Sequence, residues 1–189
     1  MAGRRTDMRE RIRSVAMQLF SEQGYENTSM REIAERLSVT KAALYYHFKA
    51  KEDIVISLSD ELRAGVDAIL AWAATQPPGP ETGQQILARY GDVMHGVGRD
   101  MVRFMAENQP AFRRLEIGAV LRYQFVQVAD AMTAHDPTPL CVFHARQALL
   151  ATSWSITMTS DLDLTDDQLR TAAAAIAHDI FARTYRPLD

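Results

Sequence analysis

The sequence contains little cysteine and no long hydrophobic run. Its single cysteine, Cys141, excludes a disulfide within the chain and any site built from several thiolates. No stretch approaches the roughly 20 uncharged apolar residues that a membrane-spanning helix needs. Residues 1–13 hold five arginines and no apolar core, which is not the pattern of a secretory signal. We therefore expect a cytoplasmic protein that does not contact a membrane.

Signatures of catalysis and of metal binding are missing from the sequence as well. The histidines are His47, His95, His135, His144 and His178. Their spacing matches no metal-binding motif, no glycine loop fits a phosphate, and no serine stands in a G-x-S-x-G setting. Cys141 begins a helix, where a thiolate can be favoured, so a redox role and a buried filler both remain open for it. We predict that the chain is not an enzyme and needs no cofactor and no metal ion.

Charge is distributed unevenly along the chain. Residues 1–51 hold ten Lys or Arg and six Asp or Glu, whereas residues 52–189 hold eleven and eighteen, which together make the net charge of -3. A basic end on an acidic body indicates that this end meets a polyanion such as nucleic acid. The alternative is ordinary scatter, since small segments often carry a few excess charges.

Apolar residues recur at helical spacing over most of the chain. One face of a first helix is formed by Ile12, Val15, Ala16, Leu19 and Phe20. Beyond two short helices, longer ones are expected at about 51–74, 81–97, 99–107, 110–134, 139–160 and 165–184. No alternating run favours a strand. The prediction is an all-α fold, with a small N-terminal three-helix domain at 1–50 and a larger C-terminal helical domain at 51–189.

The two short helices are expected at about 29–37 and 41–47. Ser29 and Glu32 fit the S-x-x-E capping box, in which each side chain satisfies the other residue's free amide. Thr40 is a good N-cap for the second helix. Two short helices joined by a turn of three or four residues form a helix-turn-helix. Its second helix has the right length to lie in the major groove of DNA.

The second short helix carries an unusual row of side chains. Leu44 and Phe48 face inward, which leaves Tyr45, Tyr46 and His47 on the outer side. Exposed aromatic residues in a row need an explanation, and contact with phosphate or bases supplies one. The alternative is a buried three-helix bundle whose tyrosines pack and only point their hydroxyls outward.

The order of residues in this region adds a resemblance to a known family. The chain reads FSEQGY at 20–25, TSMREIAERL at 28–37 and VTKAALYYHFKAKE at 39–52. Over roughly residues 8–54 it closely resembles the DNA-binding domain of TetR-family transcriptional regulators. One departure is Ser38, where the family often has glycine. We expect that a serine there needs only a turn without strain.

The resemblance implies a set of DNA contacts. The residues that match base-reading positions are Arg31, Lys41, Ala42, Ala43 and Tyr45. Those that match phosphate contacts are Ser29, Thr40, Tyr46, His47 and Lys51. The first free amides of the helix at Lys49–Lys51 also suit a phosphate. Arg4 and Arg5 lie on a stretch that looks disordered, and either reach the minor groove or form a solvated basic tail.

The family acts as homodimers on near-palindromic operators, so the resemblance also implies a dimer. In the family the last two helices pair with their mates, which here are the helices at about 139–160 and 165–184. Residues at helical spacing on them are Leu149, Thr152, Ile156, Leu169, Ala172, Ala173, Ile176 and Ile180. The alternative is that these residues are simply the core of one domain.

The family uses the remaining helices for a small-molecule pocket. Methionine and aromatic side chains suit an adaptable apolar cavity. The candidates are Trp72, Tyr90, Met94, Met101, Phe104, Met105, Phe112 and Tyr123. Polar candidates for orienting a ligand are His95, Arg122, Gln127 and His144. Ordinary core packing is the alternative for each, and an apolar or amphipathic, partly aromatic effector is favoured.

These expectations combine into one function. We predict a dimeric repressor that an unknown small-molecule effector releases from its DNA operator. The alternatives are an enzyme or a small-molecule carrier that uses the C-terminal cavity, or a DNA-binding protein without a ligand.

Overall fold

The computed structural model describes residues 2–96, 98–108, 116–159 and 162–185, and these ranges contain helices and no strand. In chain order the elements are α1 (Ala2–Gln23), α2 (Met30–Arg36), α3 (Lys41–His47), α4 (Lys51–Ala73), α5 (Pro80–His95), α6 (Gly98–Glu107), α8 (Glu116–Met132), α9 (Pro139–Met158), α10 (Asp166–Ala182) and a short 3-10 turn, η1 (Arg183–Tyr185). The all-α prediction is confirmed. Within the described ranges no helix is long and apolar enough to cross a membrane.

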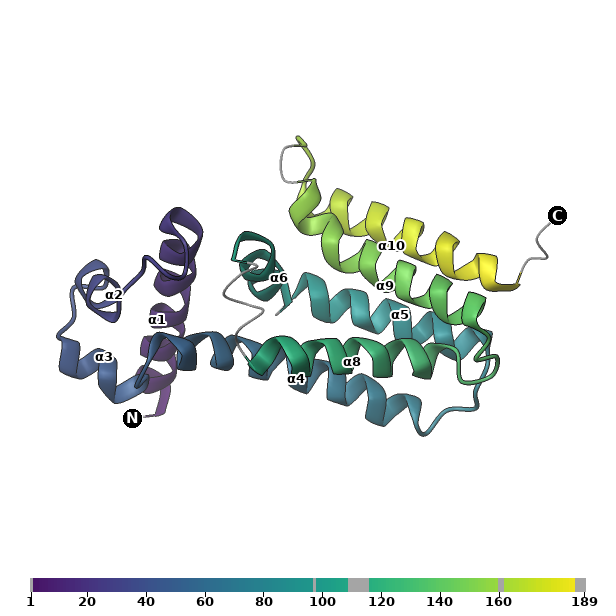
Figure 1. Cartoon of the computed structure of the whole chain (residues 1–189), viewed down its shortest axis with the longest axis horizontal. Coiled ribbons are helices and arrows are strands. Elements are labelled where there is room, and N and C mark those ends of the chain that lie inside the picture. Colours follow the sequence, from purple (N-terminus) through teal and green to yellow (C-terminus); the bar gives the residue numbers. More distant parts are fainter. Residues whose placement is uncertain (1, 97, 109–115, 160–161, 186–189) are drawn as a thin grey trace.

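Helices α1, α2 and α3 form a separate unit at one end of the molecule (Figure 1). The predicted apolar face of α1 is buried at Ile12, Ala16 and Phe20. Ile33 of α2 and Leu44 of α3 are also fully buried, so the three helices pack on one another, and their buried residues continue into the apolar core of the rest of the molecule. The predicted three-helix arrangement is therefore confirmed.

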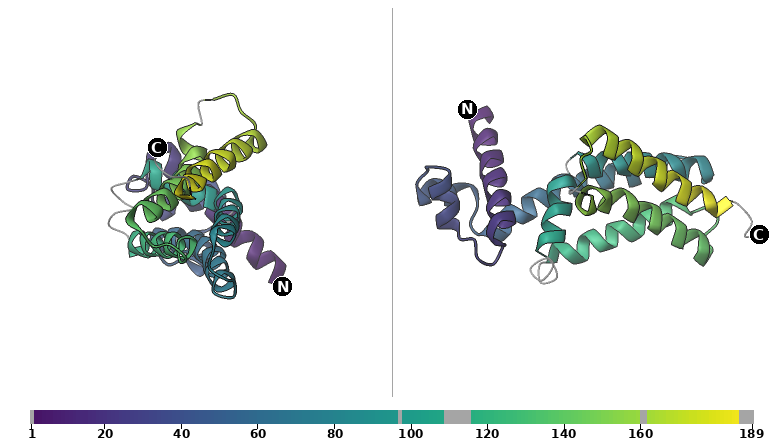
Figure 2. Two further views of the ribbon diagram at one scale, coloured as in Figure 1. Left: turned by 90° about the vertical axis from the view of Figure 1, so that its right-hand side faces the viewer. Right: turned by 90° about the horizontal axis from the view of Figure 1, so that it is seen from above.

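Helix α4 runs from this unit into a larger helical bundle (Figure 1). In that bundle α4 packs against α5 and α8, and α9 packs against α5, α8 and α10. Helices α9 and α10 lie side by side, as both views in Figure 2 show, and in Figure 1 they are on the side of the bundle opposite α4. Because α4 contributes to both units, it connects them directly.

Close packing in the bundle depends on a glycine of α5. A Cβ atom on Gly83 would lie 2.7 Å from the Met132 carbonyl oxygen and 2.7 Å from the ring of Phe181. Phe181 belongs to α10 and is fully buried. The absence of a side chain at position 83 thus lets α5 approach α8 and α10 closely.

The helix boundaries differ little from those predicted. The expected helix at 110–134 is described as α8 from Glu116 to Met132, and its predicted start at Pro110 lies outside the described residues. Arg4 and Arg5 are within α1, so the expectation of a disordered arm is wrong for their backbone. Their side chains lie outside the described residues.

The turn after α2 corrects another expectation. Ser38 has a φ of 56°, in the left-handed region that side chains disfavour. The amide of Val39 donates to the Ala34 carbonyl at 3.0 Å, and the amide of Ser38 donates to the Glu35 carbonyl at 3.0 Å. This pair of bonds is the Schellman ending of a helix, which requires a left-handed residue at this point. The serine is therefore strained, contrary to the prediction of an unstrained turn.

Candidate nucleic-acid interface and ligand cavity

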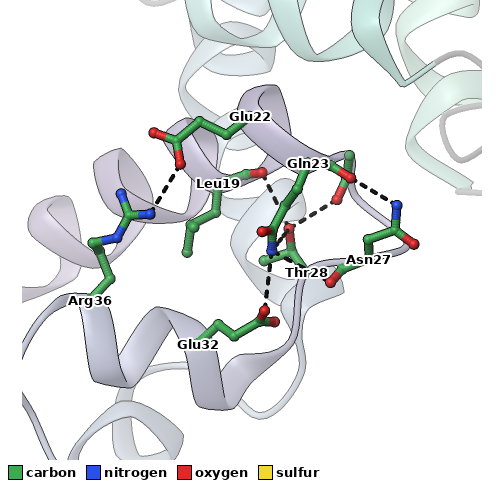
Figure 3. Close-up of polar contacts among 8 residues, drawn as sticks. Leu19, Glu22, Gln23, Asn27, Thr28, Glu32 and Arg36 are labelled. Atoms are coloured by element: carbon green, nitrogen blue, oxygen red, sulfur yellow. Dashed lines mark hydrogen bonds and ion pairs between the residues drawn. The ribbon is translucent and has the colours of Figure 1, made fainter.

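Polar contacts fix the position of α2 against α1 (Figure 3). The hydroxyl of Thr28 donates to the Gly24 carbonyl at 2.9 Å and accepts from Nε2 of Gln23 at 3.3 Å. At the other end of α2, the Arg36 guanidinium lies 3.0 Å from a carboxylate oxygen of Glu22. Helix α2 is thus held at both ends, and α2 in turn supports α3.

Side-chain caps start both short helices, as predicted. The Glu32 amide donates to Ser29 Oγ at 3.2 Å, and the Ser29 amide donates to the Glu32 carboxylate at 2.7 Å. The Ser29 hydroxyl and amide stabilise the charged carboxylate and lower the pKa of Glu32 below its ordinary value. At α3, the Ala43 amide donates to the hydroxyl of Thr40 at 3.2 Å.

One face of α3 is open to solvent. Leu44 and Phe48 are buried, whereas Tyr45 is 42% exposed and Tyr46 is 65% exposed. The exposed residues of α3 are Lys41, Ala42, Ala43, Tyr45 and Tyr46. The alternative in which the tyrosines pack inside the bundle is therefore excluded. A short helix with small residues near its start and aromatic hydroxyls beside them matches the shape that the major groove accepts.

Other predicted DNA contacts lie around this face. Ser29, Arg31 and Thr40 are exposed, and His47 is half-buried with its ring 5.3 Å from that of Tyr46. The Arg31 guanidinium lies 2.6 Å from the carboxylate of Glu35. That exposed ion pair is weak enough to exchange for a phosphate or a base edge.

Lys51, predicted as a phosphate contact, forms hydrogen bonds within the protein. Its ammonium donates to the carbonyls of Tyr25 at 2.6 Å, Thr28 at 3.1 Å and Glu26 at 3.3 Å. It also lies 4.2 Å from the centre of the Tyr25 ring, within cation–π distance. An ammonium has three hydrogens, so these carbonyls use its donor capacity. Sequence reasoning missed this role because the three acceptors are backbone atoms distant in the chain.

The predicted phosphate site at the start of α4 already has an anion. Oδ2 of Asp53 accepts from the amides of Lys49 at 2.8 Å and Ala50 at 3.0 Å. Asp53 thus supplies the negative charge that suits a helix N-terminus. The signal was present in the sequence, because an acidic residue three positions after a helix start is a common cap.

Tyr25 joins the N-terminal unit to α6. Its ring meets Phe20 at 5.1 Å and Phe104 at 5.7 Å between centroids, both edge to face. Its amide donates to Oδ1 of Asn108 at 2.7 Å. Burial, reinforced by nearby Glu52 and Glu26, raises the pKa of Tyr25 to about 12. The phenol is therefore neutral, and the end of α6 rests on the loop that precedes the helix-turn-helix.

The larger bundle contains a cavity of about 410 Å³ that is partly open to solvent. Its walls come from α4, α5, α6, α8 and α9. The apolar lining residues include Leu62, Val66, Met94, Met105, Leu121, Phe125 and Leu150. Polar atoms enter from Tyr90, Ser153, Gln124 and Arg122. A cavity of this size and character suits a small apolar molecule.

Part of the predicted ligand set lines this cavity. Tyr90, Met94, Met105 and Arg122 do so. Phe104 and Met101 are fully buried away from the described lining, and Phe104 packs on Tyr25 instead. Phe112 lies outside the described residues.

The remaining candidates also lie apart from the described lining. Trp72 stacks with Arg89, whose guanidinium carbon is 4.1 Å from its ring centre, and Tyr123 is 65% exposed on the outside of α8. Gln127 and His144 are not among the lining residues, and His95 borders a separate groove between α5 and α10. Ser153 and Trp154 of α9 were missed, because helical spacing alone does not say which helix closes a cavity.

Some of the predicted dimer residues on α9 and α10 are buried within the protomer, and others face outward. Leu149, Thr152 and Ala173 are buried within the protomer. Ala172 and Ile176 are exposed, Leu169 and Ile180 are partly buried, and the Ile176 side chain is 56% exposed. Phe143 on α9 is 55% exposed as well. The side chain of Ile156 lies outside the described residues. An outward apolar face therefore remains on these two helices.

Cys141 lies in surroundings that disfavour a reactive thiolate. The residue is buried, and burial raises the pKa of its thiol. A thiolate is thus disfavoured, which removes the feature that would have supported a redox role.

Comparison with known sequences finds relatives of the N-terminal unit. The family described as "Bacterial regulatory proteins, tetR family" matches residues 12–58. The chain is 48% identical over 48 residues to the HTH-type transcriptional regulator AcrR of Shigella flexneri, which covers 25% of this chain and 22% of AcrR. It is 45% identical over 47 residues to the negative transcriptional regulator IcaR of Staphylococcus aureus, which covers 25% of each chain. The matched part thus spans about a quarter of these relatives.

Comparison with solved structures extends over the whole fold. PfmR from Thermus thermophilus, a TetR-family regulator, matches with a TM-score of 0.69 and 23% identity, over 96% of this chain and 97% of PfmR. FadR from Bacillus subtilis, solved in complex with stearoyl-CoA, matches with a TM-score of 0.63 and 17% identity, over 95% and 98%. These matches show that the C-terminal bundle shares their fold.

Proposed function

By its N-terminal domain and its fold the chain is a TetR-family transcriptional regulator, and from this premise we propose that it is a homodimeric repressor released from its operator by a small apolar effector. TetR-family regulators are not enzymes, which agrees with the sequence prediction. The observation that carries the proposal is the exposed face of α3, where Ala42, Ala43 and the two tyrosines stand clear of the core. IcaR, a relative in this region, is described as a negative regulator, which supports repression.

The test of operator binding is selection of bound fragments from random double-stranded DNA, followed by gel-shift titration. Ala43→Glu places an anion against the groove and should abolish binding to the selected fragment. Ala68→Glu, at an exposed position of α4 outside both α3 and the helices of the proposed dimer, is the matched control and should bind as the wild type does. Wild-type affinity of Ala43→Glu in dilute buffer would show that α3 does not enter the groove.

Lys41 separates base reading from phosphate contact. Lys41→Ala should relax the sequence preference at one operator position if Lys41 donates to a base. A uniform loss of affinity over all fragments would assign Lys41 to the phosphate backbone instead.

A dimer is required by the geometry of DNA. Two recognition helices must meet major grooves about 34–36 Å apart, and only a fixed pair of subunits sets that distance. The outward apolar face of α9 and α10, with Phe143 and Ile176, supports pairing through these helices.

Release is proposed to act through α4 and α6. Leu62 and Val66 of α4 line the cavity, while Lys51 at the start of α4 holds the loop of Tyr25. Met105 of α6 also lines the cavity, and its neighbour Phe104 packs on Tyr25. A ligand releases DNA if it binds more tightly to a conformation in which the two α3 helices of the dimer no longer match the spacing of the major grooves. To shift the population almost completely to that conformation, the ligand must prefer it by about 5.5 kcal/mol. Titration calorimetry with and without operator tests this, and equal affinities would remove the switch.

The two alternative functions have less support. A DNA-binding protein without a ligand is expected to have a solidly packed bundle, whereas this bundle contains a partly open cavity of about 410 Å³. An enzyme needs several ionisable groups converging on the cavity. The described lining has Tyr90 and Arg122, and Arg122 is exposed.

A further inference from the structure

Two hydroxyl groups form a polar spot on the otherwise apolar cavity wall. Oη of Tyr90, on α5, lies 3.0 Å from Oγ of Ser153, on α9. Both side chains line the cavity, and each residue is only 6% exposed. Ser153 Oγ also lies 2.9 Å from the Leu149 carbonyl oxygen. The direction in which these hydroxyls donate their hydrogens therefore decides whether a ligand at this wall finds hydrogen-bond donors or acceptors.

A count of hydrogens fixes the direction of these bonds. A carbonyl oxygen only accepts, so the Ser153 hydroxyl donates to Leu149. The Tyr90 hydroxyl then donates to Ser153, which places both hydrogens in bonds. The reverse direction would leave the phenol hydrogen without an acceptor in a buried place, which costs free energy. Burial raises the pKa of Tyr90, so the phenol keeps its hydrogen.

The pair thus offers lone pairs to the cavity and no hydrogen. We propose that this wall selects an apolar ligand with a hydroxyl group, which donates its hydrogen to Tyr90 Oη. This inference rests on the proposed function for its biological role, since it concerns the same effector cavity. A ketone, an ether or a carboxylate presents only acceptors to the Tyr90–Ser153 pair. An ammonium is disfavoured because the described lining holds no carboxylate and includes the Arg122 cation.

The structure provides an optical probe for the test. Trp154 lines the cavity, so binding should change the tryptophan fluorescence of the full chain. The probes are 1-decanol and 2-decanone, two ten-carbon chains whose oxygen lies on the first or second carbon and carries a hydrogen only in the alcohol. We expect 1-decanol to bind about 3- to 10-fold more tightly, the range of one net hydrogen bond. Equal affinities, or tighter binding of the ketone, would overturn the inference.

The variant Ser153→Ala tests the assigned direction of the hydrogen bonds more directly. Without Ser153 Oγ the Tyr90 hydrogen is free to donate to the ligand, so 2-decanone should gain affinity and the preference should vanish or reverse. Thr152→Val is the matched control, because it removes the neighbouring buried hydroxyl, which bonds the Ala148 carbonyl at 3.0 Å and is not among the lining residues. It should keep the wild-type preference. An unchanged preference in Ser153→Ala would contradict the assigned direction of the bonds.

The outcomes separate this inference from the proposed function. Binding of both probes without preference overturns the inference and leaves the effector cavity standing. Selective binding of 1-decanol with full retention of operator DNA supports the recognition and argues against release. Failure of both probes to bind overturns the inference and counts against an effector in this cavity. Because the wild type alone gives the first comparison, the test does not depend on the folding of a variant.

Discussion

Ser38 shows how one residue can oppose the geometry around it. The Schellman ending of α2 demands a left-handed residue, and the chain has a serine with a φ of 56° there. The turn positions α3, so it persists despite its cost. The resemblance to the family showed that a serine stands where glycine is usual, but it did not show that this serine is strained. The φ angle depends on how the helix ends and not on the type of residue.

Ser38→Gly should stabilise the protein. Relief of left-handed strain is worth about 1–2 kcal/mol, and the greater freedom of glycine in the unfolded chain offsets part of it, so we expect a net gain of about 1 kcal/mol. Urea unfolding followed by circular dichroism measures this. Ser38→Ala is the control and should give no gain, because alanine keeps the Cβ atom. A loss of stability in Ser38→Gly would show that the serine is not strained.

Glu32 makes the start of α2 sensitive to acid. Its pKa is lowered in the folded state, so its contribution to stability is present above its ordinary pKa of 4.5 and is lost as the pH falls through the lowered value. Glu32→Gln keeps a capping side chain without the charge. The melting temperatures of the two proteins should differ near pH 7 and converge in strong acid. A difference that stays constant with pH would exclude this role of the charge.

At the scale of elements, α4 combines three tasks. Lys51 and Asp53 hold its first turn, Leu62 and Val66 line the cavity, and its remaining length packs on α5 and α8. Its length and apolar stripe were predictable from spacing, since the helical period is local. Its contacts were not, because they join residues such as Lys51 and Tyr25 that are distant in the chain. The same limit explains why the sequence did not point to Ser153, which lines the cavity together with the predicted candidate Met94.

The two lysines before and within α4 should respond differently to substitution. Lys51→Met removes an ammonium from three carbonyls, so it should cost roughly 2 kcal/mol of stability. The exposed Lys49 gives the matched control. Lys49→Met should leave the melting temperature unchanged and, if Lys49 meets a phosphate, reduce the salt dependence of DNA binding by about one unit of slope. Thermal melting and gel shifts at several salt concentrations distinguish the two. An unchanged melting temperature for Lys51→Met would show that these bonds do not stabilise the fold.

At the scale of the whole molecule, two units are joined at two places. Helix α4 is continuous between them, and the end of α6 rests on Tyr25 through Phe104 and Asn108. The division into a small and a large helical unit was predictable from composition and periodicity. The second junction was not, because nothing in the spacing of α6 says which neighbour it meets.

The assembly can be tested on the outward face of α9 and α10. Ile176→Arg places a charge on this face, so the proposed dimer should dissociate and operator affinity should fall by at least about 100-fold as two-point attachment is lost. Light scattering after size exclusion gives the mass. Tyr123→Arg, at an exposed site on α8, is the control and should leave the mass unchanged. A dimeric Ile176→Arg would place the interface elsewhere.

The hydrogen bond and the cation–π contact between Lys51 and Tyr25 restrict how the N-terminal unit can move relative to α4. A flexible joint at residue 50 would let the N-terminal unit of α1, α2 and α3 rotate freely relative to α4. Here Lys51, in the first turn of α4, donates to carbonyls of the loop that precedes α2, so we expect α4 and the N-terminal unit to move together. In the proposed dimer, we expect a change in the distance between the two α3 helices to arise farther along α4, among the turns that line the cavity.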